Sequence, residues 1–93
     1  MNRKKLTTSG KEEVVLLTDF FDGSWRAGAL VYWADGRTSR RPLGQSAPFS
    51  SEREATVKTL EYLLSFKSYF IDETVQDLEA ALKNALQSSI FGD

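Results

Sequence analysis

The sequence predicts an α+β fold in which a three-stranded antiparallel meander is followed by two α-helices packed on the sheet. Two features of the sequence predict it. Before residue 44, runs of β-branched and aromatic residues are separated by two Asp-Gly pairs, which are typical of tight hairpin turns. After residue 50, apolar residues recur three or four positions apart, which is helical spacing. Strands grouped before helices favour an antiparallel sheet.

The three strands are expected at residues 14–21, 25–34 and 37–43. Asp22-Gly23 and Asp35-Gly36 supply the two turns, because a type I′ turn needs positive φ at both central positions. The third strand is expected to be short and at an edge, since Pro42 cannot donate a ladder hydrogen bond. The second strand is then central, where its apolar residues are protected from pairing with another chain.

A first helix is expected from Ser51 to about Tyr69. Ser51 and Glu54 fit a capping box, in which each side chain accepts a hydrogen bond from the other residue's backbone. A second helix is expected to begin at Asp72 or Thr74 and to reach Ile90, because its apolar residues form one stripe at helical spacing.

A chain of 93 residues is the size of one domain. We expect the polar, basic residues 1–11 to form a flexible tail and residues 12–93 to form a single α+β domain. No apolar stretch approaches the ~18 residues that a membrane span needs, so no membrane contact is expected. The chain has no cysteine, and small secreted domains usually need disulfides, so a cytoplasmic location is expected.

The composition also argues against catalysis. The chain has neither histidine nor cysteine, which supply most nucleophile–base pairs and many metal ligands. Its six glycines are scattered and form no phosphate-binding loop. We therefore expect no catalytic residue, no metal site, no cofactor and no enzymatic activity.

Two-residue loops in both hairpins sort the strand residues onto two faces. The expected core face carries Val14, Leu16, Phe20, Trp25, Ala27, Ala29, Val31 and Trp33. The other face is mixed, and its candidate interaction residues are Val15, Leu17, Phe21, Leu30 and Tyr32. Because a sheet face open to water is normally polar, something is expected to cover these residues. The second helix, a second copy of the chain and a foreign protein are all candidates.

The net charge of −1 hides an asymmetry. Residues 1–50 carry eight positive and five negative groups, whereas residues 51–93 carry four positive and eight negative groups. The candidate contacts for an anion or a nucleic acid are Arg26, Arg37, Arg40 and Arg41, because arginine matches phosphate geometry and an antiparallel ribbon can enter a DNA groove. Against this, the pI is about 5.4, and arginines on an edge strand also serve to discourage edge pairing.

The sequence therefore predicts a small, non-enzymatic protein-interaction domain, with an adaptor or regulatory role. Its partner is expected to be another protein or a second copy of the chain, which would make it a homodimer. The alternative is a nucleic-acid-binding domain that uses the basic strand surface.

Overall fold

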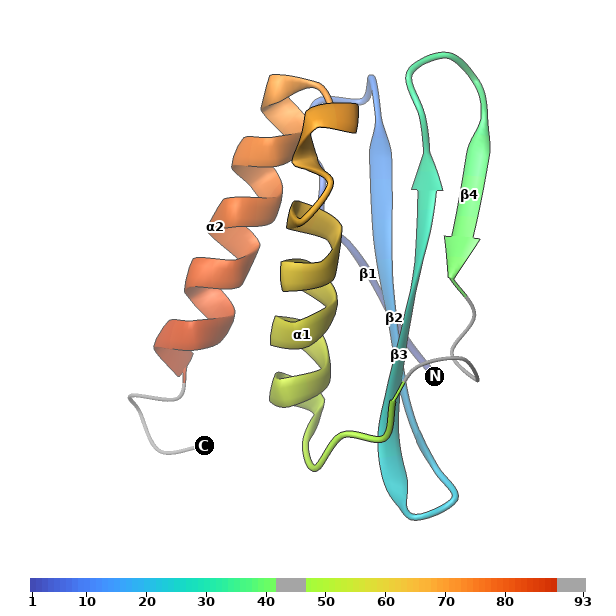
Figure 1. Ribbon diagram of the computed structural model, residues 1–93, viewed down its shortest axis with the longest axis vertical. Coiled ribbons are helices and arrows are strands. Elements are labelled where there is room, and N and C mark those ends of the chain that lie inside the picture. The colour runs from blue at the N-terminus through green and yellow to red at the C-terminus, as the bar shows by residue number, and fades with distance from the viewer. Residues whose placement is uncertain (42–46, 89–93) are drawn as a thin grey trace.

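The computed structural model describes residues 1–41 and 47–88. Its elements are β1 (Asn2–Lys5), β2 (Glu13–Phe21), β3 (Ser24–Tyr32), β4 (Thr38–Arg41), α1 (Glu52–Leu64), the 3₁₀ turn η2 (Lys67–Tyr69) and α2 (Asp72–Ser88). The strands form one antiparallel sheet in the order β1-β2-β3-β4. Both α-helices lie on the same side of this sheet (Figure 1). The expected α+β class, with an antiparallel sheet and two helices, is confirmed.

The sheet has four strands and not the three expected, because the N-terminal segment pairs with β2. In this pairing Arg3 lies opposite Leu17, and Lys5 lies opposite Val15. Composition predicts a tail here, since short charged segments carry no strand signal of their own. The pairing is favoured instead by β2, whose residues are apolar on both faces and which therefore lies inside the sheet with a neighbour on each edge.

The β2–β3 hairpin has the expected register. Asp22 and Gly23 form its two-residue turn, with φ angles of 55° and 80°. Phe20 lies opposite Trp25, and the two rings contact edge to face with centroids 5.6 Å apart. The Asp-Gly signal and the alternation of apolar residues thus specify this part of the sheet.

The β3–β4 hairpin differs from the expected one by one residue. Its loop has three residues, because Trp33 N–H donates to the Arg37 carbonyl at 2.8 Å. Gly36 ends the loop in the left-handed region, with φ 92°, as three-residue hairpin loops require. The Asp35 carboxylate holds this shape by accepting a hydrogen bond from Arg37 N–H at 3.0 Å.

This difference moves the β4 side chains to the opposite faces of the sheet. Leu30 lies opposite Arg40, and Ala29 lies opposite Arg41. The two-residue loop expected from the sequence would instead place Leu30 opposite Arg41, so that expectation is wrong. Pro42 and Leu43, which the sequence places at the end of this strand, lie outside the described residues.

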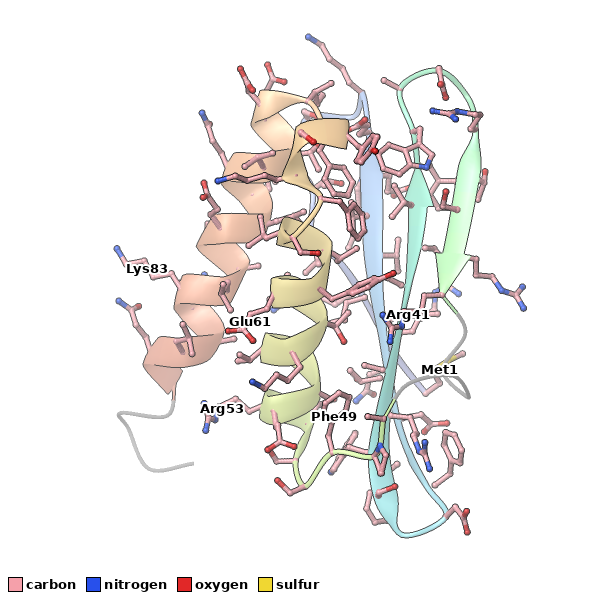
Figure 2. All side chains as sticks on the ribbon, in the orientation of Figure 1. Met1, Arg41, Phe49, Arg53, Glu61 and Lys83 are labelled. Atoms are coloured by element: carbon pink, nitrogen blue, oxygen red, sulfur yellow. The ribbon has the colours of Figure 1, made fainter. Side chains whose placement is uncertain are left out.

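The core lies between the sheet and the helices, where side chains of the two layers meet (Figure 2). Its buried residues are Leu6, Val14, Leu16, Ala29, Val31, Leu60, Leu63, Phe70 and Leu78, with Trp33 packed against them. The expected core face is thus confirmed for most of its length. Phe20 is the exception at 57% exposed, because it lies in the end of the β2–β3 hairpin that extends past α1 (Figure 1).

Helix α1 begins as expected, since Ser51 Oγ accepts a hydrogen bond from Glu54 N–H at 3.0 Å. The Glu54 carboxylate accepts from Ser50 N–H instead of the Ser51 N–H of a standard capping box. The helix ends at Leu64, earlier than expected, and the chain turns through η2 so that Phe70 stacks on Trp33 at 4.9 Å. The expected end of the second helix at Ile90 lies outside the described part of the chain.

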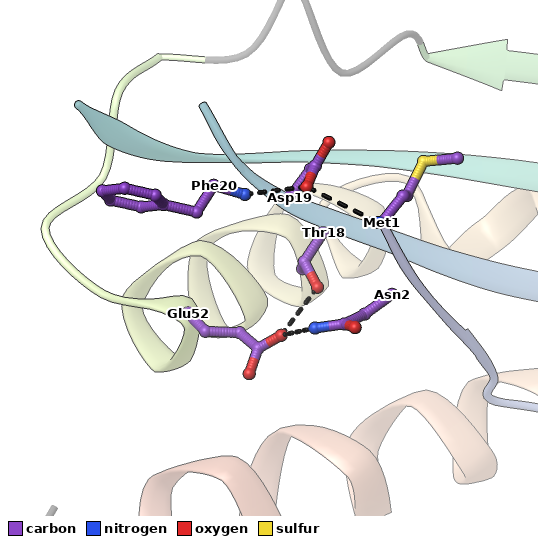
Figure 3. Close-up of polar contacts among 6 residues, drawn as sticks. All are labelled: Met1, Asn2, Thr18, Asp19, Phe20 and Glu52. Carbon is purple, nitrogen blue, oxygen red and sulfur yellow. Dashed lines mark hydrogen bonds and ion pairs between the residues drawn. The ribbon is translucent and has the colours of Figure 1, made fainter. Parts of the chain in front are cut away.

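Buried or half-buried carboxylates hold both helices against one side of the sheet. Glu52 Oε2, at the start of α1, accepts hydrogen bonds from Thr18 Oγ1 at 2.9 Å and from Asn2 Nδ2 at 2.6 Å (Figure 3). Glu12 Oε1 accepts from Ile71 N–H at 3.1 Å, just before α2 begins. Because these contacts anchor both helix starts to one face, the other face of the sheet stays open.

Candidate interaction surface

The face of the sheet opposite the helices is the principal candidate site, and we call it the open sheet face. Its residues alternate along each strand with those that face the core. They are Arg3, Lys5, Glu13, Val15, Leu17, Asp19, Phe21, Arg26, Gly28, Leu30, Tyr32, Thr38 and Arg40. Neither α-helix covers this face (Figure 1). Helix α2 is therefore excluded as the cover that the sequence suggested.

Positive charge predominates on the open sheet face. Its four cationic side chains come from three strands and are Arg3, Lys5, Arg26 and Arg40. Its two carboxylates each lie near a positive group. Lys5 Nζ is 3.4 Å from Glu13 Oε1, and the N-terminal amine of Met1 is 3.6 Å from Asp19 Oδ1 (Figure 3). The face thus presents a net positive charge to an approaching partner.

Helix α2, on the other side of the sheet, has the opposite character (Figure 1). Helix α2 carries four carboxylates, from Asp72, Glu73, Asp77 and Glu79, against the single cation of Lys83. Lys83 projects from α2 on the side away from the sheet (Figure 2). The charge asymmetry of the sequence is therefore realised as an asymmetry between two sides of the folded domain, which orients the domain toward an anionic partner.

The register arranges the open sheet face into rows. One row crosses all four strands and consists of Lys5, Val15, Leu30 and Arg40. Because neighbouring strands are about 4.8 Å apart, this row is about 14 Å wide. The next row places Arg3 beside Leu17. An aliphatic centre is thus bordered by cations on both edges of the sheet.

Two aromatic rings lie at opposite ends of the open sheet face. Phe21 is 39% exposed and Tyr32 is 38% exposed. Phe21 pairs with Ser24 and Tyr32 pairs with Glu13, so the rings are eight positions apart along the strands, or about 26 Å. The Arg26 guanidinium lies 5.8 Å from the centroid of the Phe21 ring, within the range of a cation–π contact.

The apolar residues that the sequence proposed for interaction differ in exposure. Phe21 and Tyr32 are exposed and Leu30 is half-buried, but Val15 and Leu17 are only 7% and 8% exposed. Both lie in a central strand between longer side chains of the neighbouring strands, whose stems cover apolar surface. Their burial therefore needs no partner, and the expectation that something must cover them loses its basis.

The four candidate arginines are divided between different surfaces. Arg26 and Arg40 lie on the open sheet face. Arg41 lies on the helix side, 4.1 Å from the centroid of the Tyr62 ring, between the end of β4 and α1 (Figure 2). Arg37 Nε lies 2.8 Å from Asp35 Oδ2 inside the hairpin loop. The two-residue loop expected from the sequence would have placed Arg37 and Arg41 on one face with Tyr32. This grouping is wrong, because the longer loop shifts the register.

The contact between Arg37 and Asp35 is also electrostatic. The hydrogen bond from Arg37 N–H is the main cause that holds the pKa of Asp35 below its ordinary value. Desolvation opposes this shift of the pKa, and the Arg37 guanidinium adds to it. Arg37 thus stabilises the loop between β3 and β4 through its contacts with Asp35.

Arg3 and Lys5 lie in the segment expected to be a flexible basic tail, and the sequence did not reveal that β1 places them on the open sheet face. The available signal was indirect: a strand that is apolar on both faces lies inside a sheet and needs neighbours on both edges.

Within residues 1–41 and 47–88, no three potential metal-ligating side chains come together. In the same part of the chain, no helix has the length and apolar character to cross a membrane. The chain matches no protein-family model, and comparison with curated proteins and with solved structures finds no significant match.

Proposed function

We propose that this protein is a small, non-enzymatic interaction domain whose open sheet face binds an acidic surface of a partner protein. The observation that supports this proposal is the row formed by Lys5, Val15, Leu30 and Arg40. Val15 is buried in this row, so the row offers a partner the charges of Lys5 and Arg40 and the half-buried side chain of Leu30. A partner surface that presents Asp and Glu is complementary to it in charge. The acidic helix α2 repels such a partner and so favours docking on the sheet.

A homodimer through the open sheet face is disfavoured by the same charges. In a two-fold dimer the same surface patch meets itself, so two faces of net positive charge are brought together. Like charges facing each other across an interface cost several kcal/mol. The edge strands also resist pairing with a second copy, since β1 and β4 are each four residues long and rich in Lys and Arg.

Single-stranded nucleic acid is the second candidate partner. The exposed rings of Phe21 and Tyr32 favour it, because bases stack on exposed aromatic side chains while arginines contact the phosphates. One feature counts against it. The rings are about 26 Å apart, so they do not form one stacking platform.

The two candidates are distinguished by ¹H–¹⁵N NMR titrations with two probes. One probe is an acidic peptide of glutamates with leucines at helical spacing, and the other is a mixed-sequence single-stranded DNA oligonucleotide. We expect the peptide to shift the resonances of Arg3, Lys5, Arg26 and Arg40, and the shifts to weaken between low salt and about 0.15 M salt. The matched control is the same peptide with glutamine in place of glutamate, which should bind far more weakly.

Three results decide between the proposals. If only the oligonucleotide binds, and it shifts resonances of the open sheet face, the partner is a nucleic acid and not a protein. Binding of neither probe contradicts the proposal. Shifts confined to α1 and α2 also contradict it, because they place the contact on the wrong side of the sheet.

A further inference from the structure

The contact between Arg41 and Tyr62 divides a groove that runs between β4 and α1 on the helix side. A hollow of about 170 Å³ opens on one side of this pair, and a hollow of about 160 Å³ opens on the other. Trp33, Ser39 and Phe66 line the first hollow, and Phe49 and Lys58 line the second. Both hollows share Arg41 and Tyr62, so the pair lies between them.

The groove is cationic. Among the described residues that line the two hollows there is no Asp or Glu. Lys58 lies 3.6 Å from Glu61 and is thus engaged on α1. Arg41, by contrast, is half-buried and contacts the face of the Tyr62 ring, with no carboxylate of residues 1–41 and 47–88 at ion-pair distance. Its planar fork of N–H donors is therefore available to an anion.

The first hollow has a fixed aromatic wall. Trp33 stacks on Phe70 with ring centroids 4.9 Å apart, and its Nε1–H donates to Ser39 Oγ at 2.8 Å. These two contacts hold the indole in one orientation. Phe66 lines the same hollow and stacks on Phe70 at 5.7 Å. A flat apolar group can therefore enter without reorganising the wall, which lowers the cost of binding.

We infer that this groove binds a small organic anion with one flat apolar ring, its carboxylate on Arg41 and its ring in the hollow beside Trp33. Arginine and carboxylate form paired, charge-assisted hydrogen bonds. The hollow limits the size of the ligand, since sites for drug-sized molecules have volumes of about 300–1,000 Å³ and this one has about 170 Å³.

The two proposed sites lie on opposite sides of the sheet. Arg41 shares a sheet face with the core residue Ala29, whereas Arg40 shares the other face with Leu30 and also lines the first hollow. Arg41 and Trp33 belong to the groove alone, so tests at these two residues do not bear on the open sheet face.

Benzoate is a suitable probe, because it carries one carboxylate on one flat ring. The chain has two tryptophans, so ¹H–¹⁵N spectra contain two indole N–H resonances. Trp33 lines the groove, whereas Trp25 lies at the far end of the sheet beside Phe20 and acts as an internal control. We expect benzoate to shift the Trp33 indole resonance saturably and to leave the Trp25 resonance in place.

Two comparisons test the role of Arg41. Benzamide has the same shape without the charge, and it should bind about tenfold more weakly than benzoate to the unmodified protein. Arg41→Gln should weaken benzoate binding by about tenfold, whereas Lys83→Gln, which removes the same charge from the far side of α2, should not. The inference is overturned if benzoate gives no saturable shift of Trp33, or if benzamide binds as well as benzoate. It is also overturned if a folded Arg41→Gln variant binds benzoate like the unmodified protein.

Discussion

The guanidinium of Arg41 lies 4.1 Å from the centroid of the Tyr62 ring, and so joins the last residue of β4 to the last turn of α1. The preceding residue, Arg40, lies opposite Leu30 on the other face of the sheet. Two consecutive arginines therefore serve different surfaces. One packs an edge strand against a helix, and the other contributes to the positive charge of the open sheet face.

This division predicts different effects of the two alanine substitutions. Arg41→Ala should lower the free energy of unfolding by about 1 kcal/mol, because it removes a cation–π contact and the side-chain stem between β4 and α1. Arg40→Ala should change it by less than about 0.5 kcal/mol, as is usual for exposed positions. Urea unfolding followed by circular dichroism measures both values. Equal effects would mean that the two side chains do not differ in environment.

A buried hydroxyl in α2 gives a prediction of opposite sign. Thr74 is fully buried, and its Oγ1 has no hydrogen-bond partner within the described part of the chain. Thr74→Val should raise the free energy of unfolding by about 1 kcal/mol, because it removes an unsatisfied polar group and keeps the shape.

Thr18→Val is the matched control, since Thr18 Oγ1 donates to Glu52 Oε2 at 2.9 Å. This substitution should lower the free energy of unfolding by about 1 kcal/mol. Thermal unfolding of the two variants should therefore move the midpoint in opposite directions. A shift in the same direction for both would refute the assignment of their hydrogen bonds.

The carboxylate of Glu12 is expected to contribute strongly to stability. It is 3% exposed and accepts a hydrogen bond from Ile71 N–H, next to the N-terminus of α2, where backbone N–H groups need partners and favour negative charge. Glu12→Ala should lower the free energy of unfolding by about 1.5–3 kcal/mol. Glu12→Gln should lower the free energy of unfolding by less, because glutamine keeps a side-chain oxygen that can accept the hydrogen bond from Ile71 N–H.

The neighbouring Glu13 supplies the control for this measurement. It is half-exposed and lies 3.4 Å from Lys5 Nζ, so Glu13→Ala should cost less than about 1 kcal/mol. A larger loss for Glu13 than for Glu12 in urea unfolding would show that the Glu12 contact with Ile71 does not anchor α2.

The loop between β3 and β4 has a predictable pH response. The pKa of Asp35 is below its ordinary value in the folded protein, so its ionised form stabilises the loop above its unfolded pKa. That contribution is lost as the pH falls through the folded pKa. The backbone N–H of Arg37 is the main cause of the lowered pKa of Asp35, and Arg37→Gln keeps this N–H. The substitution should therefore raise the pKa of Asp35 only part of the way to its ordinary value. Carboxyl ¹³C NMR titration measures the pKa of Asp35 in both proteins. If the pKa of Asp35 in the variant returned fully to its ordinary value, the guanidinium of Arg37 and not its backbone N–H would be the cause of the shift.

Much of the fold could be predicted from the sequence because its signals are local. The alternation from Val14 to Trp33, with Asp22-Gly23 between the strands, specifies the first hairpin and the face that packs on the helices. Ser51 marks the start of α1 for the same reason, since a capping residue acts within one turn.

The remaining features depend on contacts that are not local. Residues 2–5 form a strand only because β2 offers them an edge. The second Asp-Gly pair is compatible with a two-residue or a three-residue loop, and the choice follows the contacts between Asp35 and Arg37. The division of the arginines between two surfaces follows from that choice, so it could not be predicted from the sequence alone.

The proposed function requires that the cations of the open sheet face bind an acidic partner. Its most direct test is the affinity of two variants for the acidic leucine-containing peptide, each of which lacks four positive charges. One carries Gln at Arg3, Lys5, Arg26 and Arg40, and the other carries Gln at Lys11, Lys58, Lys67 and Lys83. The first variant should bind at least about tenfold more weakly than the unmodified protein, while the second, with the same net charge, should change affinity far less. Equal loss of affinity in both folded variants would contradict the proposed function, because net charge and not the open sheet face would then account for binding.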